Sequence, residues 1–297
     1  MRFRGHETFF VRKGWISKGI KAVERDPEVF VTKDKDKNPM DVLGIGSNMV
    51  KSLRYWLQAC GITYESEKGK KIQYFTSLGE MIRKNDRYVE ELGTLLLLQY
   101  RLASNLDQAT SWYFFFNEFP ASEFTREDFV SALQGYIVMN GDTVASRSMH
   151  DDFSCILNTY IPRYKTNPDK ISPENNIDCP FGELGLVDIM NKEKKLYRKT
   201  APAVSMLDPW IILAVIMEQA GNANEVGLNN LLNDRCNIGR VFNLDVITMI
   251  DALRKAEKTG AIKIIRTAGL DVVRIDRHFS FEDCVTNYYK SIEGERS

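Results

Sequence analysis

Two segments of this sequence, one near each end, contain an amphipathic helix that leads directly into a short hairpin. In the first, apolar residues recur at helical spacing behind Gly46-Ser47-Asn48, and Gly61 ends the helix. They are Met49, Val50, Leu53, Trp56, Leu57 and Cys60. In the second, Asp245 caps a helix whose expected buried stripe is Val246, Ile247, Ile250, Leu253 and Ala256. This order predicts a winged helix-turn-helix module at both ends of the chain.

Residues 1–88 are expected to form the first module. A helix is predicted from Trp15 to Arg25, because Asp26-Pro27 disfavours helical geometry beyond it. The segments 62–65 and 71–75 flank a polar turn, which predicts a hairpin with a basic, glycine-containing tip. The chain then enters Thr76-Ser77-Leu78-Gly79, which resembles the strand-to-helix exit of many winged helices.

In a winged helix-turn-helix, the second helix of the pair docks in the major groove and the wing reaches a neighbouring backbone. The helix over 47–60 is expected to expose Lys51, Ser52, Arg54, Tyr55 and Gln58. DNA contacts are therefore predicted at Ser47, Asn48, Lys51 and Arg54 on the helix and at Lys68, Lys70 and Lys71 on the wing. The alternative is a module that contacts protein, with these cations solvated.

Residues 201–297 are expected to form the second module. Asp208 and Pro209 begin an almost wholly apolar helix, and a short helix over 227–232 follows. The third helix, capped by Asp245, precedes a hairpin over 261–275. A local basic patch is predicted at Arg254, Lys255, Lys258 and Arg266. This module either contacts DNA through that patch or serves as a dimerisation or protein-docking surface.

Residues 89–200 are expected to form a helical central domain. Its expected elements are an apolar helix over 89–106, a buried aromatic run over 112–116, a helix capped by Thr125 with Asp128, a helix over 148–160, a loop over 163–177 and a hairpin of 184–187 with 196–198. The fold class predicted for the chain is mainly α, with small β-hairpin wings.

Charge is distributed unevenly along the chain. Its 40 basic and 40 acidic residues give a formal net charge of +0, which excludes a histone-like polycation. Residues 1–90, however, hold 18 basic and 12 acidic residues, so this third is biased toward polyanions. No apolar run has the length of a membrane helix, and the start of the chain lacks the apolar segment of a secretory signal. Five scattered cysteines without a CxxC pair suggest reduced thiols and a cytoplasmic location.

The common catalytic and nucleotide-binding motifs are absent from the sequence. It contains no Walker A loop, GxGxxG, HExxH or GxSxG, and its three histidines disfavour a histidine-based metal site. We therefore expect a non-enzymatic protein without a metal or cofactor. One alternative stays open, because Asp178 or Asp188 with Glu193-Lys194-Lys195 distantly resembles the carboxylate and lysine pattern of metal-dependent nucleases. Cys179 is expected to be a buried free cysteine rather than a reactive thiol.

Several short motifs together resemble those of the bacterial domain of unknown function 4007 family. They are Arg4-Gly5-His6-Glu7-Thr8-Phe9 with Arg12, Trp15 and Gly19; Gly44-Ile45-Gly46-Ser47-Asn48-Met49-Val50 with Arg54-Tyr55-Trp56-Leu57; and Cys179-Pro180 with Glu183-Leu184-Gly185-Leu186. The resemblance covers most of the chain and implies an association with DNA phosphorothioate modification systems that defend against phage. It implies no catalytic residues.

These considerations favour a DNA-binding accessory subunit of such a modification or defence system. One alternative is a transcriptional regulator of the same type of locus, and another is an adaptor that binds protein but not DNA. The expected partners are double-stranded DNA, a sulfurtransferase related to phosphoadenosine phosphosulfate reductase or another subunit of the system, and a second copy of the chain, but no membrane. His6 and Glu7 are expected to pair and clamp the N-terminus, or else to touch a partner or a phosphate.

Overall fold

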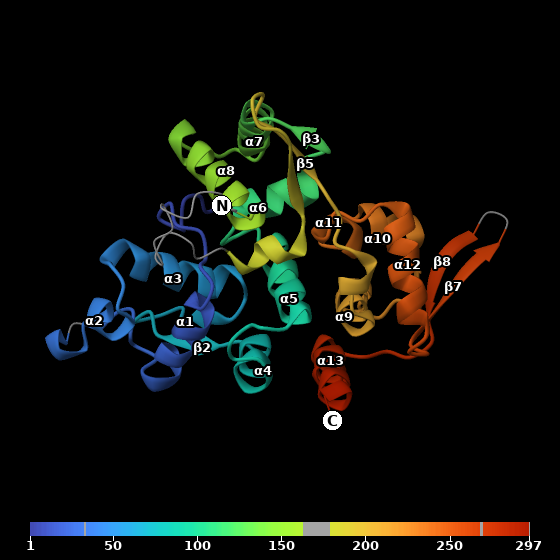
Figure 1. The fold of residues 1–297 in the computed structure, drawn as a ribbon, viewed down its shortest axis with the longest axis horizontal. Coiled ribbons are helices and arrows are strands. Elements are labelled where there is room, and N and C mark those ends of the chain that lie inside the picture. Colours follow the sequence, from blue (N-terminus) through green and yellow to red (C-terminus); the bar gives the residue numbers. More distant parts are fainter. Residues whose placement is uncertain (33, 163–178, 268–269, 297) are drawn as a thin grey trace, which may run out of the picture.

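The computed structural model describes residues 1–32, 34–162, 179–267 and 270–296, so the loop expected over 163–177 and the candidate ligand Asp178 lie outside it. The described chain is mainly α-helical with small antiparallel sheets (Figure 1). The helices are α1 (Trp15–Arg25), α2 (Pro39–Leu43), α3 (Ser47–Ala59), α4 (Ser77–Asn85), α5 (Leu92–Ala103), α6 (Thr110–Tyr113), α7 (Arg126–Met139), α8 (Ser146–Tyr160), α9 (Pro209–Ala220), α10 (Leu228–Asn233), α11 (Ile238–Val241), α12 (Val246–Glu257) and α13 (Phe281–Arg296). Short helical turns are η1 (Lys35–Lys37), η2 (Phe114–Glu118), η5 (Pro180–Leu184) and η6 (Val204–Met206).

The strands form one hairpin and two three-stranded sheets. They are β1 (Thr63–Glu65), β2 (Gln73–Phe75), β3 (Glu123–Phe124), β4 (Val187–Asn191), β5 (Leu196–Lys199), β6 (Glu225–Gly227), β7 (Ile262–Thr267) and β8 (Leu270–Ile275). The sheet orders are β1-β2, β3-β5-β4 and β6-β8-β7. The β1–β2 and β7–β8 hairpins lie on opposite sides of the molecule (Figure 1).

Local capping signals placed several helices correctly. Helix α1 has the predicted bounds without a capping side chain, because Pro27 limits its end. Thr76 caps α4 by accepting a hydrogen bond from the backbone N–H of Gly79. The Thr125–Asp128 capping box begins α7, and Asp208 accepts from the first backbone N–H groups of α9. Side-chain oxygens satisfy the unpaired N–H groups of a first helical turn, which explains why these boundaries are readable from sequence.

Helix α3 is covered on a second face that the periodicity did not reveal. Ser52 and Tyr55, expected to be exposed, are buried. The N-terminal segment lies across them: the Ser52 hydroxyl donates to the carbonyl of Phe9, and the Tyr55 ring packs against Gly5. The expectation was wrong because spacing within one helix cannot register a segment that packs onto its other side.

The first turn of α12 is more exposed than expected. Val246 and Ile247 were expected in the buried stripe but are 54% and 75% exposed, whereas Ile250, Leu253 and Ala256 are buried as expected. The stripe therefore begins one turn later than predicted. Two apolar side chains remain on the surface at the start of this helix.

Other elements begin later than expected or were not expected. Helix α5 begins at Leu92, three residues beyond the predicted start, and β4 begins at Val187, behind the turn η5. Helices α2, α11 and α13 and strands β3 and β6 were not predicted.

The predicted aromatic run lies in the core. Trp112, Tyr113, Phe114, Phe115 and Phe116 are all buried, and their rings pack edge to face with other aromatic side chains. Buried residues from all three segments, 1–88, 89–200 and 201–297, belong to one continuous cluster. The three segments therefore share a core, and the domain boundaries remain a prediction.

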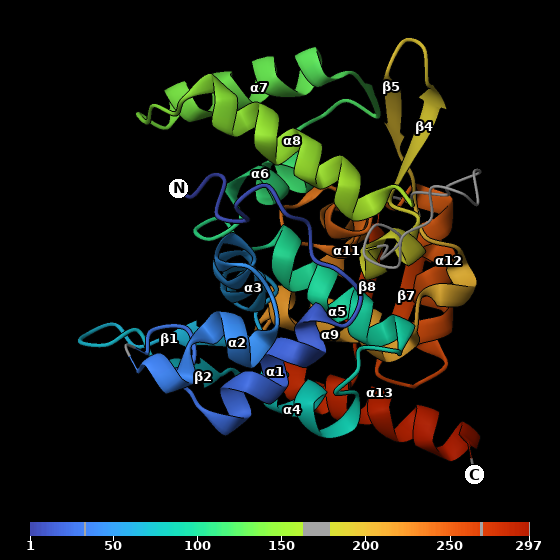
Figure 2. The same cartoon turned by 60° about the vertical axis from the view of Figure 1, so that its left-hand side comes forward.

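Helix α13 joins the last segment to the first two. It packs against α9 and α4, and it crosses the lower part of the molecule in Figure 2. The Tyr288 hydroxyl accepts a hydrogen bond from the backbone N–H of Gly93, and the hydroxyls of Thr94 and Tyr289 are 2.8 Å apart. These buried contacts fix α13 against the start of α5.

Two further expectations concern membrane helices and cysteines. Within the described residues, no helix combines the length and apolar character required to cross a bilayer. Four of the five cysteines are buried, Cys179 among them as predicted, and Cys236 is half-buried.

We expect Gly93→Ala to lower the free energy of unfolding by about 1–3 kcal/mol, because the added Cβ would overlap the Tyr288 ring and force α13 from α5. Gly135→Ala is the matched control, because Gly135 is exposed within α7 and its Cβ would meet open space. That change is expected to stabilise the protein by about 0.5–1 kcal/mol. Urea unfolding of both variants measures the difference, and equal effects would contradict the packing argument.

Candidate functional site

The start of α3 presents polar side chains beside the β1–β2 hairpin. Ser47, Asn48 and Lys51 are exposed, because the inward face of the helix is occupied by residues such as Leu53 and Leu57. A hydroxyl, an amide and an ammonium at a helix start are groups that reach phosphate oxygens and base edges.

The loop between β1 and β2 carries the predicted wing lysines. Lys68, Lys70 and Lys71 are all exposed. The Lys70 ammonium lies 2.9 Å from Glu28, and that of Lys71 donates to the backbone carbonyls of Ser66 and Glu67. Such exposed contacts are weak, so these cations remain available to an anionic ligand.

Arg54 connects α3 to the hairpin. Its Nε donates to Glu65 at 2.6 Å, and the amides of Gln58 and Gln73 donate to the same carboxylate. Burial alone would raise the pKa of Glu65, but the hydrogen bonds from Arg54 and the two amides lower that pKa below its usual value. Arg54 therefore positions the hairpin, and its contact with DNA remains a prediction.

Two exposed tyrosines lie on the solvent face of the same hairpin. Tyr64 and Tyr74 are direct cross-strand partners, 53% and 44% exposed, with ring centroids 5.6 Å apart. Cross-strand aromatic pairs stabilise short hairpins. This pair was not predicted from the sequence, although alternation along the two strands was the available signal.

The predicted C-terminal patch is only partly free. The Lys255 ammonium donates to the backbone carbonyls of Val204 and Leu207, so it holds η6 against α12. Arg254 pairs with Asp251, and Arg266 pairs with Asp271. Lys258 is exposed and has no described ion pair within the residues covered by the structure. This patch is electrostatically weaker than the N-terminal one.

His6 anchors the N-terminal segment to the central helices. It is fully buried, and its Nε2 lies 2.8 Å from Asp152 of α8. The expected pair of His6 with Glu7 is therefore replaced by a contact with α8. The other Asp152 oxygen accepts from the Ser111 hydroxyl, and the backbone N–H of Arg4 donates to Asp152 as well. Glu7 is half-buried and forms no described side-chain hydrogen bond within the part of the chain that the structure covers.

The backbone around His6 takes an uncommon conformation. Arg4, Glu7 and Thr8 have φ of 55°, 49° and 68°, in the left-handed region. The Thr8 N–H donates to Nδ1 of His6, which assigns the remaining imidazole proton to Nε2, facing Asp152. Gly5 has no room for a side chain, because a Cβ would meet the Tyr55 ring at 2.5 Å. The described role of His6 is structural.

We expect Asp152→Ala to lower the free energy of unfolding by about 2–6 kcal/mol, because it leaves the buried His6 and Ser111 donors without their acceptor. Its neighbour supplies the control. Asp151 is more exposed and pairs with Arg4, so Asp151→Ala is expected to cost at most about 1 kcal/mol. Thermal and urea unfolding distinguish the two, and similar losses would contradict an anchoring role for Asp152.

The alternative metal site finds little support among the described residues. In that part of the chain, no group of three or more histidine, cysteine, aspartate or glutamate side chains is placed to hold a metal ion. Asp188 pairs with Arg198 at 2.8 Å, and Glu193 lies in the exposed turn between β4 and β5. The two do not form a described carboxylate cluster.

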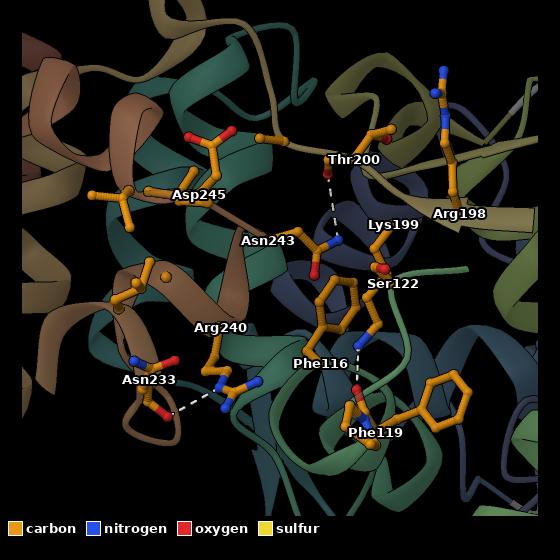
Figure 3. Close-up of a pocket in the computed structure, with 16 residues that line it drawn as sticks. Phe116, Phe119, Ser122, Arg198, Lys199, Thr200, Asn233, Arg240, Asn243 and Asp245 are labelled. Atoms are coloured by element: carbon orange, nitrogen blue, oxygen red, sulfur yellow. Dashed lines mark hydrogen bonds between the residues drawn. The ribbon is translucent and has the colours of Figure 1, made fainter. Parts of the chain in front are cut away.

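A cavity of about 610 Å³ lies where β5 meets α11 and the start of α12 (Figure 3). It was not predicted from the sequence. Its polar lining includes Ser122, Arg198, Lys199, Arg240 and Asn243. The remaining lining is largely apolar, with Phe116, Phe119, Leu232, Leu244 and Val246. Its size is within the range of small-molecule sites.

Lys199 lines this cavity, and its ammonium group has an unusual environment. Its ammonium donates to the backbone carbonyls of Phe115 and Phe119 at 2.6 and 2.7 Å and lies over both rings. Figure 3 shows the hydrogen bond to Phe119. Burial, and secondarily the charge of Arg240, lowers the pKa of Lys199 from 10.5 to about 7. Since this pKa is lower in the folded than in the unfolded chain, folding releases a proton between these values.

We expect the Lys199→Met variant to become more stable relative to the parent protein as the pH falls from about 10 to about 7. Stability that depends on Lys199 rises with pH through this window, because the folded state loses its proton first. The difference in free energy of unfolding should change by at most about 1.4 kcal/mol per pH unit. Urea unfolding at several pH values across this range measures the difference in free energy of unfolding. For the exposed control Lys194→Met, this difference should not change with pH.

A family model described as "Protein of unknown function (DUF4007)" matches residues 3–289. Among curated proteins, none matches the sequence.

Two solved structures have the same fold. One, described as the SspB crystal structure, has a TM-score of 0.80, and the other, described as magnesium ion-bound SspB, has a TM-score of 0.79. In each case the sequence identity is 25%, and the match covers 99% of this chain and 95% of the other. The similarity therefore extends over all three segments.

Proposed function

This chain belongs to the DUF4007 family, and from that premise we propose that it is a DNA-binding accessory subunit of a phosphorothioate modification or related phage-defence system. It grips duplex DNA, mainly through phosphates, and presents the duplex to modifying enzymes. The link to phosphorothioate systems rests on the resemblance of the sequence motifs to this family. The DNA-binding role rests on the N-terminal module.

The order α1, α2, α3, β1, β2 supports a winged helix-turn-helix in which α3 is the recognition helix. Helices α1 and α2 both pack on α3, and β1 follows it directly. The observation that carries the proposal is the set of exposed polar groups on this one module. Asn48 and Lys51 lie on α3, and Lys68 and Lys71 lie on the hairpin loop, in the third of the chain with the basic excess.

The C-terminal elements α9, β6, α10, α12, β7 and β8 follow a second winged-helix order. Its expected recognition helix begins with exposed Val246 and Ile247, which offer no charge to a phosphate. Exposed apolar side chains favour contact with a protein partner, because such a contact removes them from water. We therefore assign DNA to the N-terminal module and a protein partner of the system to the C-terminal one.

We expect Lys51→Ala combined with Lys71→Ala to weaken duplex binding several-fold and to reduce its salt dependence by about two counterions. The measurement is fluorescence anisotropy with a labelled duplex, with and without phosphorothioate, at several salt concentrations. Lys290→Ala is the control, since Lys290 is exposed on α13 and belongs neither to α3 nor to the β1–β2 hairpin. Arg54→Ala is less diagnostic, because it also releases Glu65 beneath the hairpin.

The alternatives give different results in the same assay. A transcriptional regulator would strongly prefer one promoter sequence over a random duplex. An adaptor without DNA binding would show no salt-sensitive binding even at low ionic strength, which would exclude our proposal. Because magnesium is bound in one similar structure, the assay includes Mg²⁺ and chelator arms. Mg²⁺-dependent cutting that is lost in Glu193→Ala would favour the nuclease instead.

A further inference from the structure

We propose that the cavity between β5, α11 and the start of α12 binds a small phosphate-bearing molecule. This site is separate from the DNA surface on α3 and does not depend on it. Figure 3 shows the side chains of Arg240 and Lys199 entering the cavity from α11 and β5. These two basic groups and the size of the space around them favour such a ligand.

The two cations lack a protein counter-charge. Nε of Arg240 donates to the backbone carbonyl of Asn233, which leaves the two terminal nitrogens of its guanidinium without a described partner. Lys199 contacts only carbonyl oxygens and aromatic rings. Within the described chain, neither group forms an ion pair, and the charge of Arg240 adds to burial in lowering the pKa of Lys199 to about 7. A bound anion would pair with Arg240 and favour the protonated form of Lys199.

The nearby carboxylates are already engaged. Asp245 caps α12 by accepting from the backbone N–H of Thr248, and Asp188 pairs with Arg198, which points away from Arg240 in Figure 3. Neither is the counter-ion of Arg240 or Lys199. Asp245 also lines the cavity but forms no described ion pair with either group within the residues that the structure covers, so Arg240 is available to an external anion.

The shape of the cavity selects a phosphate ester over a bare ion. At about 610 Å³ the cavity is far larger than a phosphate group. Beyond the cations, its wall continues along apolar Leu232, Leu244 and Val246, which suit an organic substituent. Two free guanidinium nitrogens match the bidentate geometry of phosphate oxygens.

The test is calorimetric titration of the full chain with inorganic phosphate and with adenosine monophosphate, at constant ionic strength. Sodium acetate controls for general anion binding. We expect both phosphate compounds to bind and acetate not to bind. Arg240→Gln is expected to weaken binding at least about tenfold, because it removes a charged bidentate donor. Arg277→Gln, at an exposed position outside the cavity, should leave the affinity unchanged.

A second pair of variants guards against a misfolded Arg240→Gln protein. Val246 lines the cavity and is 54% exposed, so it tolerates a polar side chain. Val246→Glu should weaken phosphate binding by repulsion, whereas the isosteric Val246→Gln should not.

Two results would overturn the proposal: the absence of phosphate and adenosine monophosphate binding, or binding that is insensitive to both Arg240→Gln and Val246→Glu. A duplex that loses affinity in Arg240→Gln as strongly as the monophosphate does would reassign the site to backbone phosphate. Duplex binding that depends on Lys51 and Lys71 but not on Arg240 would be consistent with a separate small-molecule site. Failure of the protein to bind DNA would not contradict phosphate binding in this cavity.

Discussion

The buried carboxylate of Asp152 joins three parts of the chain that are distant in sequence. It accepts hydrogen bonds from the N-terminal segment, through His6 and the Arg4 backbone, and from Ser111 at the start of α6, while itself belonging to α8. A charge buried this deeply is tolerable only where its oxygens are satisfied. The N-terminal segment in turn covers α3, so the position of the proposed recognition helix depends on a carboxylate that belongs to α8.

Local signals in the sequence were sufficient for much of the helical framework. Capping side chains and apolar periodicity act between near neighbours, which explains the correct placement of α1, α3, α4, α7 and α9. What failed depended on distant contacts. Tyr55 is buried by a segment fifty residues before it, and α13 has only a partly amphipathic pattern and is fixed by contacts with α4 and α9.

The candidate sites divide in the same way. Exposed residues of α3 and the wing could be chosen from sequence, because helix and hairpin geometry alone place Lys51, Lys68, Lys70 and Lys71 on the surface. The cavity could not be predicted from the sequence. Lys199 lies on strand β5 and Arg240 on helix α11, and only tertiary packing brings them to the same cavity. Lys255 illustrates the converse: it occupies the expected helix, yet its ammonium satisfies two backbone carbonyls.

The contact between Gly93 and Tyr288 has a consequence for synthesis of the chain. The two residues are 195 positions apart, so the surface of α5 that receives α13 has no partner while those residues are being made. At about 5–20 residues per second, this interval lasts roughly 10–40 seconds. The rest of α5 packs against α6, η5, α9 and α11, which are all made before α13. The core around Gly93 and Thr94 therefore closes last, when α13 has emerged.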